Sequence, residues 1–168
     1  MELPKREKNR LENYDYSQEG AYFITLCTHN RQNLFILEGN RVGNDLCVVP
    51  PLQNEIIRKW IKETENKFQN IKFEKYVIMP DHIHFIINIA ERHTGRSLRE
   101  IMQFFKTMTT NDYIKNVKNG KLKPFDKKLW QKSYYDHIIR NQEDYNEKWD
   151  YIENNPKKWG FTHTEQED

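Results

Sequence analysis

Two histidines separated by one residue are the first feature of the sequence that suggests chemistry. His82 and His84 open a run of β-branched and apolar residues that follows the turn-forming pair Pro80-Asp81. Side chains alternate between the two faces of a strand, so both imidazoles project from one face. Two neutral imidazoles so placed can bind one divalent metal ion and leave positions open for water and a substrate oxygen. The alternative is a pair of surface histidines with ordinary hydrogen bonds, because His-x-His often occurs by chance.

The same strand predicts where the core lies. The face of the histidines continues with Ile86 and Asn88. The opposite face is continuously apolar, and we expect it to pack under helices; it carries Ile83, Phe85, Ile87 and Ile89. The histidine face is therefore predicted to be an open face of the sheet, and replacing either histidine is predicted to leave the fold intact.

A second candidate group is a tyrosine on the last expected helix. At about 100° per residue, Tyr145, Trp149 and Ile152 form one narrow stripe that should face the core. Tyr151 lies off that stripe, in line with Asp144, Lys148 and Asn155. A phenolate can attack a phosphodiester and hold the DNA as a covalent phosphotyrosine. Because the phenol pKa is about 10, a metal ion that polarises the phosphate would help. The alternative is an amphipathic tyrosine at the shoulder of the helix.

Charge is distributed unevenly along the chain, although the net charge is only +2. Residues 115–132 hold seven lysines against one acidic residue, whereas residues 141–168 hold eight acidic residues against three lysines. A basic stretch of this kind fits a protein that contacts phosphates along one side. A solvated lysine loop is an equal alternative. The cations that we assign to DNA are Arg10, Lys121, Lys123, Lys127, Lys128, Lys132 and Arg140, with further basic residues in the N-terminal segment at Lys5, Arg6 and Lys8.

Composition indicates one globular domain over residues 1–168, with its core at about 14–160. Aromatic residues reach 13%, which offsets the low mean hydropathy of −1.00 and argues against disorder. Cys27 and Cys47 have no metal-binding spacing, and Cys27 is expected to be a small core residue. No signal peptide or membrane span is apparent, so a cytoplasmic protein is expected.

The order of expected elements is strand, helix, strand, strand, helix, strand and a final helix. The hydrophobic patterns place them at residues 22–28, 52–68, 72–79, 82–90, 97–117, 134–139 and 143–155. Ser97 and Glu100 match a capping box for the second helix, and Pro156 is expected to stop the last one. This βαββαβ order predicts an α+β, ferredoxin-like antiparallel sheet with helices on one face and an additional C-terminal helix carrying the tyrosine.

Four stretches of the chain carry a resemblance to a known family, and they occur in the family's order. They read YDYS and GAYFITLCT with Arg31 (residues 14–31), VIMPDHIH (77–84), WQKSYYDHIIRN (130–141) and DYIENNP with Trp159 (150–159). In these stretches the chain resembles the REP-associated tyrosine transposases, relatives of the single-tyrosine insertion-sequence transposases in the HUH class. The resemblance implies a ferredoxin-like fold, which agrees with the order of elements.

The resemblance also implies roles for individual residues. The histidines that bind Mg²⁺ or Mn²⁺ match His82 and His84, the nucleophile matches Tyr151, and the amide that completes the metal site matches Asn155. His137 falls in a family motif without an assigned role; it could bond DNA, orient a ligand or pack. The departures are Asp81 before the first histidine, the connection over residues 31–51, and an end soon after Trp159.

The function expected from these features is a metal-dependent single-strand DNA endonuclease and strand transferase, acting as a monomer or a homodimer. Tyr151 would form a 5′-phosphotyrosine at single-stranded DNA near a hairpin, and a 3′-hydroxyl would reverse the step. No nucleotide-binding G-x-x-x-x-G-K-[ST] loop occurs, as expected for a reaction that conserves the diester energy. Two other classes remain open: a ferredoxin-like nucleic-acid-binding module without catalysis, and a metal-dependent hydrolase that uses water.

Overall fold

The computed structural model describes residues 15, 18–36, 51–90 and 97–164, with side chains as far as Lys158. Its strands form one four-stranded sheet in the order β2-β3-β1-β4, and all neighbours are antiparallel. The strands are β1 (Gly20–Cys27), β2 (Ile71–Ile78), β3 (His82–Ile89) and β4 (Tyr135–Ile139). The helices are α1 (Leu52–Lys67), α2 (Leu98–Lys118) and α3 (Gln142–Thr164). The predicted α+β, ferredoxin-like fold is confirmed.

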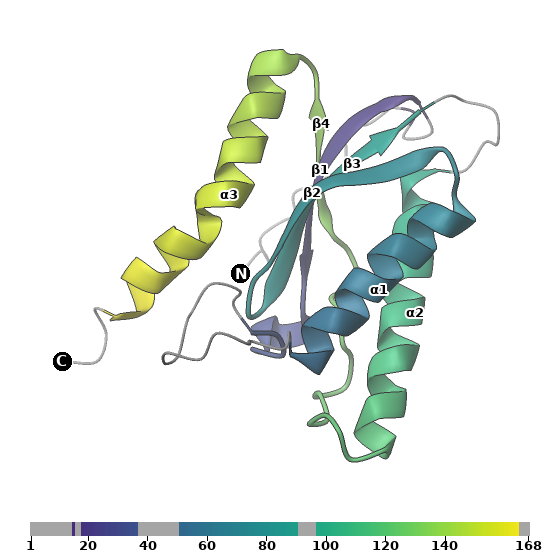
Figure 1. Ribbon diagram of the computed structural model, residues 1–168, viewed down its shortest axis with the longest axis vertical. Coiled ribbons are helices and arrows are strands. Elements are labelled where there is room, and N and C mark those ends of the chain that lie inside the picture. Colours follow the sequence, from purple (N-terminus) through teal and green to yellow (C-terminus); the bar gives the residue numbers. More distant parts are fainter. Residues whose placement is uncertain (1–14, 16–17, 37–50, 91–96, 165–168) are drawn as a thin grey trace, which may run out of the picture.

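Helices cover both faces of the sheet. Helices α1 and α2 lie side by side against one face, and α3 crosses the other (Figure 1). The main core lies under α1 and α2 and takes alternate residues of the central strands, among them Tyr22, Ile24, Leu26, Ile83, Phe85 and Ile87. The predicted apolar face of β3 is therefore confirmed. The prediction of an open histidine face is wrong, because α3 packs over it.

Local sequence signals explain where α2 begins and how α1 is held against it. The backbone N–H of Glu100 donates to the Ser97 hydroxyl, and the Glu100 carboxylate accepts from the Ser97 backbone, which confirms the capping box. Asp112 of α2 accepts hydrogen bonds from Lys59, at 2.7 Å, and from the Trp60 indole, at 2.9 Å. These bonds fix the two helices at the edge of the core.

The register between β1 and β3 brings two residues of β1 beside the histidines. Thr25 lies opposite His84, and Cys27 lies opposite His82. Both β1 residues project from the α3 face of the sheet, because Tyr22, Ile24 and Leu26 occupy the other face. Cys27 is half-buried on the histidine face, so its expected place in the core is wrong.

A second, smaller apolar cluster joins α3 to the sheet. Phe23, Ile86 and Ile152 are buried there, with Tyr145 and Trp149 packed around them. The predicted stripe of α3 does face the sheet, but only Ile152 is fully buried. Tyr145 is half-buried because it lies at the edge of the cluster, where its hydroxyl donates to Glu74 at 2.6 Å.

Helix α3 does not end before Pro156, contrary to the prediction. It begins at Gln142, where the Asn141 side chain accepts from the backbone of Asp144 at 2.9 Å, and it continues to Thr164 with Pro156 inside. A proline removes one intrahelical donor and crowds the preceding turn. A helix that is already more than three turns long can absorb that loss with a local distortion instead of ending.

Some predictions fall outside the described residues. The N-terminal cations, Arg10 among them, lie there, as does most of the connection between β1 and α1, so the single-domain prediction for residues 1–168 remains a prediction. Over the described ranges, no helix combines the length and apolar character that crossing a membrane requires.

Candidate active site

The two histidines of β3 face one another beneath α3. Their Nε2 atoms are 3.1 Å apart, and their rings meet at an interplanar angle of 74°. His82 is 6% exposed and His84 is 4% exposed. The prediction that the histidines lie outside the core is therefore wrong: Phe23 stacks on the His84 ring at 5.3 Å, and Tyr151 of α3 meets the same ring edge to face at 5.2 Å.

The outward-facing nitrogen of each histidine also has a partner. The Nδ1 atom of His82 lies 2.5 Å from the Asp81 carboxylate, and Nδ1 of His84 lies 2.8 Å from the Thr25 hydroxyl. A carboxylate accepts a hydrogen bond, so the proton of neutral His82 lies on Nδ1 and its Nε2 keeps a lone pair. The Thr25 hydroxyl can accept from His84 Nδ1–H or donate to Nδ1. In the tautomer with the proton on Nδ1, the Nε2 lone pairs of both rings face the gap between them.

The pKa values of both imidazoles are lowered. Burial is the main cause at His84, and the neighbouring His82 and Arg31 add to it, so that the pKa falls to about 3. Burial also lowers the pKa of His82, although the Asp81 carboxylate opposes the shift. Both rings are therefore neutral near pH 7, which is the form that binds metals.

The donor set fits a divalent cation. Two nitrogens that each lie about 2.1 Å from one metal are roughly 3.0–3.4 Å apart at ordinary ligand angles, and the Nε2 atoms have this spacing. Hydrogen bonds on the outer nitrogens orient such ligands and raise their basicity. No group of three His, Cys, Asp or Glu side chains in the described ranges could hold a metal.

Tyr151 lies directly beside the histidines. Its ring centroid is 5.2 Å from that of His84 and 5.8 Å from that of Phe23, in edge-to-face contacts. The residue is 43% exposed, so the ring is anchored on the sheet while the tyrosine remains accessible to a large substrate. The Lys158 ammonium lies 5.8 Å from the same ring.

Asn155 follows Tyr151 by one helical turn and is only 9% exposed. Its side chain therefore lies on the inner side of α3, together with the tyrosine. Two tyrosines at β4 could also be considered as nucleophiles: Tyr134 packs against the main core, and Tyr135 is 49% exposed. The structure thus brings His82, His84 and Tyr151 together.

His137 connects β4 to the start of α3. Its Nε2 atom lies 2.9 Å from the Asp144 carboxylate, which also accepts from the backbone N–H of Arg140 at 3.2 Å. These contacts lower the pKa of Asp144 against the opposing effect of burial. The contact ties down the first turn of the helix that carries Tyr151, and it makes His137 a structural partner of α3.

Arg31 is a residue of the site that sequence reasoning left without a role. Its Nε atom lies 2.9 Å from Asp81, and its Nη1 donates to the Cys27 sulfur at 2.7 Å. Arg31 and Asn30 both have positive φ, at 56° and 55°, a conformation that is uncommon outside glycine. These residues belong to a short 3-10 helix (His29–Arg31) just after β1. This strained turn directs the Arg31 guanidinium to Asp81.

Thr25 and Arg31 were missed because their roles depend on contacts between segments that are far apart in the sequence. The strand register would have indicated Thr25, since it lies opposite His84. Asp81 had a local signal, because an acidic residue directly before a metal-binding histidine can accept from that histidine's ring.

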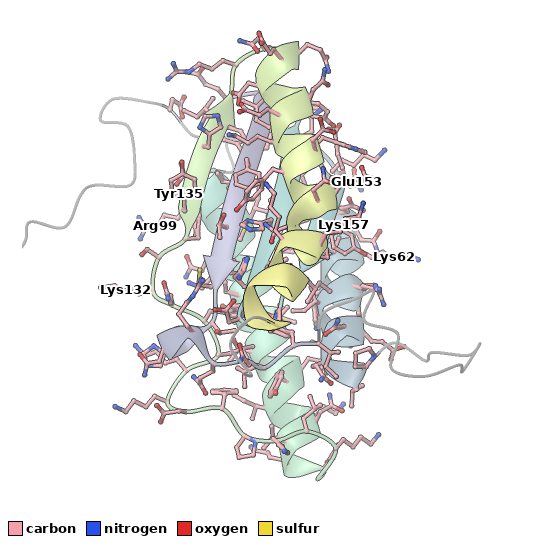
Figure 2. All side chains as sticks on the ribbon, turned by 90° about the vertical axis from the view of Figure 1, so that its left-hand side faces the viewer. Lys62, Arg99, Lys132, Tyr135, Glu153 and Lys157 are labelled. Carbon is pink, nitrogen blue, oxygen red and sulfur yellow. The ribbon has the colours of Figure 1, made fainter. Side chains whose placement is uncertain are left out.

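The basic residues assigned to DNA lie on a loop between α2 and β4. Lys121, Lys123, Lys127, Lys128 and Lys132 are exposed there, and Arg140 is exposed at the end of β4. Figure 2 shows Lys132 and Tyr135 along the β4 side of the sheet, with α3 in front of the sheet. The loop adjoins the site, because Gln131 donates to the Cys27 carbonyl at 2.9 Å and His29 donates to that of Leu129 at 3.0 Å.

Comparisons with known proteins agree with one another. A family model described as "Transposase IS200 like" matches residues 16–155. An uncharacterized protein of Haemophilus influenzae is 32% identical, over 92% of this chain and 89% of its own length. A REP-associated tyrosine transposase of Escherichia coli is 25% identical, over 87% of this chain and 72% of its own.

A solved structure has the same fold. It is a REP-associated tyrosine transposase bound to a REP hairpin, and it is 24% identical to this chain with a TM-score of 0.58. The match covers 90% of this chain and 75% of the other. At this identity the likeness establishes the fold.

Proposed function

Because the chain belongs to the family of IS200-like transposases, we propose that it is a metal-dependent endonuclease and strand transferase for single-stranded DNA, with Tyr151 as its nucleophile. One observation carries the proposal. The accessible ring of Tyr151 lies 5.2 Å from the ring of buried His84, and the Nε2 atom of His84 faces that of His82. Transfer of a phosphodiester to a tyrosine needs a nucleophile beside a site that can hold a metal ion, and Tyr151 and the two imidazoles have this arrangement.

In the proposed step, the Tyr151 oxygen attacks the scissile phosphorus. A bond forms between the phenol oxygen and phosphorus, and the bond from phosphorus to the 3′ oxygen breaks. The leaving oxygen takes up a proton and becomes a 3′-hydroxyl, while the phenol proton passes to water. The product is a 5′-phosphotyrosine, and attack by another 3′-hydroxyl reverses the step and joins new ends. One diester replaces another throughout, so no nucleotide is consumed.

The residues that would hold the cation are His82 and His84, with the Asn155 amide as the third protein ligand. Bound Mg²⁺ or Mn²⁺ supplies Lewis-acid polarisation of the phosphate. Asp81 and Thr25 bond to the outer nitrogens and orient the two rings so that their Nε2 atoms face one another. Arg31 holds Asp81, and half of its side chain remains exposed beside the site.

The proposed substrate is single-stranded DNA beside a hairpin. A related transposase is described as bound to a REP hairpin, which supports this choice. Exposed lysines on the loop before β4 supply the charge for backbone contacts. The nearby aromatic residue Tyr135, 49% exposed on the edge strand β4, provides a surface for an unpaired base.

A non-catalytic binding module of this shape is less well supported. Such domains stack bases on the open face of their sheet, whereas α3 covers that face here and buries both histidines. A hydrolase that uses water would share the histidines but would leave no covalent product. These classes therefore differ in one observable, which is a protein–DNA adduct.

The test is incubation with a library of hairpin-bearing single strands and Mn²⁺, followed by a denaturing gel. We expect a DNA-bound protein band of increased mass and a released strand with a 3′-hydroxyl. Cleavage without an adduct would support the water-using hydrolase, and binding without cleavage would support the non-catalytic module.

A further inference from the structure

A pocket between α2 and the basic loop is distinct from the proposed active site. It has a volume of about 380 Å³ and lies between the middle of α2 and residues 125–130. Three lysines and no acidic residue line it: Lys106, Lys127 and Lys128. Its apolar lining includes Ile114, Phe125, Leu129 and Trp130. A ligand that combines an apolar ring with a negative charge matches this lining.

Hydrogen bonds fix the loop wall of this pocket onto α2. The Trp130 indole donates to the Thr109 hydroxyl at 2.9 Å. The Lys106 ammonium donates to the carbonyl of Gln131 at 2.6 Å and to that of Lys132 at 3.0 Å. The pocket is thus a structured feature, held by side chains of α2 whose partners lie on the loop.

No carboxylate among the residues that line the pocket offsets the charge of its lysines. Burial lowers the pKa of the Lys106 ammonium, and the nearby Lys128 lowers it further. Lys127 and Lys128 are exposed at the rim, and Lys127 has a φ of 57°, in the left-handed region that favours glycine. An anion between these cations would relieve their mutual repulsion.

From this geometry we propose that the pocket binds one unpaired nucleotide of a DNA strand. The base lies against Phe125 and the aliphatic residues around it, and its phosphate lies at Lys127 and Lys128. A volume of this size is near the lower end of the range for small-molecule sites. Only an unpaired base exposes a whole ring face for such contact, because a base in duplex is stacked on both sides.

The pocket also lies next to the part of the sheet that carries the histidines. Its loop wall is bonded to the end of β1 through Gln131 and Leu129, and Cys27 at that end lies opposite His82. The pocket lies on the α2 side of the sheet and the histidines on the α3 side, so the strand would have to pass the end of β1 for its flanking nucleotide to reach the pocket. This inference rests on the proposed function only in taking DNA as the ligand.

The experiment measures binding of a DNA hairpin that carries a short single-stranded flank, compared with the same hairpin without a flank. Asn111→Trp fills the pocket, and Phe125→Leu removes its ring face with little loss of volume. Each should weaken binding of the flanked hairpin roughly tenfold, as loss of one stacked base does, and should leave the blunt hairpin unaffected. Lys62→Gln, on the exposed side of α1, is the control for general surface effects.

Abasic substitution along the flank then identifies the bound nucleotide. One abasic position should weaken binding to the parent protein and have no further effect on Phe125→Leu, because both changes remove the same contact. Additive losses at every position, or equal losses with flanked and blunt hairpins, would overturn the proposal. The proposal would also be overturned if free thymidine monophosphate bound tightly while the single-stranded flank had no effect on hairpin affinity. The pocket would then be a site for a small molecule.

Failure of this inference can be told apart from failure of the proposed function. If Tyr151 is not a nucleophile, no DNA adduct forms with any substrate, whatever the state of the pocket. If the pocket does not bind a nucleotide, the adduct forms equally in the parent protein and in both pocket variants. Melting temperatures of the two variants, compared with the parent, show that they are folded.

Discussion

The Nε2 atoms of His82 and His84 face each other at 3.1 Å, while their Nδ1 atoms bond outward to Asp81 and Thr25. Two lone pairs at that distance repel unless a proton or a cation lies between them. Adding Mn²⁺ should therefore stabilise the protein, by about 2.7 kcal/mol at a hundred times the dissociation constant. His84→Asn should remove the Mn²⁺-dependent rise in melting temperature, with His29→Asn as the control. An equal rise in His84→Asn would contradict the site.

Tyr151→Phe should abolish both the covalent adduct and strand transfer. The ring contacts with His84 and Phe23 remain, so the melting temperature and the affinities for DNA and Mn²⁺ should hardly change. Tyr135→Phe, at a similarly exposed tyrosine, is the matched control and should still form the adduct. Mass spectrometry of the trapped complex decides the assignment, and a modified peptide containing Tyr134 or Tyr135 instead would refute it.

The contacts around the histidine pair should control metal affinity. Asp81→Asn replaces the charged acceptor of His82 Nδ1 with a neutral amide, and Thr25→Val removes the hydroxyl partner of His84 Nδ1. Losses of about 10–100-fold in Mn²⁺ affinity are typical for such changes. Arg31→Gln should have a smaller effect, because it acts on His82 through Asp81. Calorimetric titration with Mn²⁺ measures all three. Unchanged affinity in Asp81→Asn would show that the carboxylate does not orient the ring.

Acid should destabilise the metal-free protein. The pKa of His84 is about 3 in the folded state, below the ordinary value of 6.5, so the unfolded state binds the extra proton between these values. The stability that neutral His84 contributes is complete above pH 6.5 and is lost as the pH falls towards 3. Urea unfolding of the metal-free protein across this range should show the loss, and His84→Asn should reduce its slope with pH. Parallel curves would contradict the assignment.

DNA binding should weaken steeply with salt. Each phosphate contact to a single strand adds about 0.7 to the slope of log affinity against log salt. Charge reversal of four loop lysines, Lys121, Lys123, Lys127 and Lys128, should flatten that slope. Reversal of Lys62 and Lys67 on α1 is the control. An unchanged slope in the loop variant would mean that these lysines form only a solvated surface.

The fold was largely predictable because strand and helix periods in the sequence are clear. Alternation in β3 separated Ile83 and Phe85 from the histidines, and the Ser97–Glu100 pair marked the start of α2. The hydrophobic period of a helix does not show which face of the sheet the helix packs against. The burial of His82 and His84 under α3 was therefore missed, and so was the continuation of that helix past Pro156.

The candidate site was predictable in its residue types and less so in its supporting contacts. The helical phase separated Tyr151 from Ile152, and the structure has the first exposed and the second buried. The contacts of Thr25 and Arg31 depend on strand register and on a strained turn, which residue types do not specify. Arg10 lies outside the described residues, so its assignment to DNA is still a prediction.

The alternation of β3 also protects the site against errors in folding. A slip of one residue against β1 would turn Ile83 and Phe85 towards α3 and drive His82 and His84 into the apolar core. Burying two imidazoles there without partners would cost several kcal/mol, so a misaligned sheet could hardly persist. The isoleucines beneath the sheet thereby select, during folding, the one alignment in which the imidazoles meet.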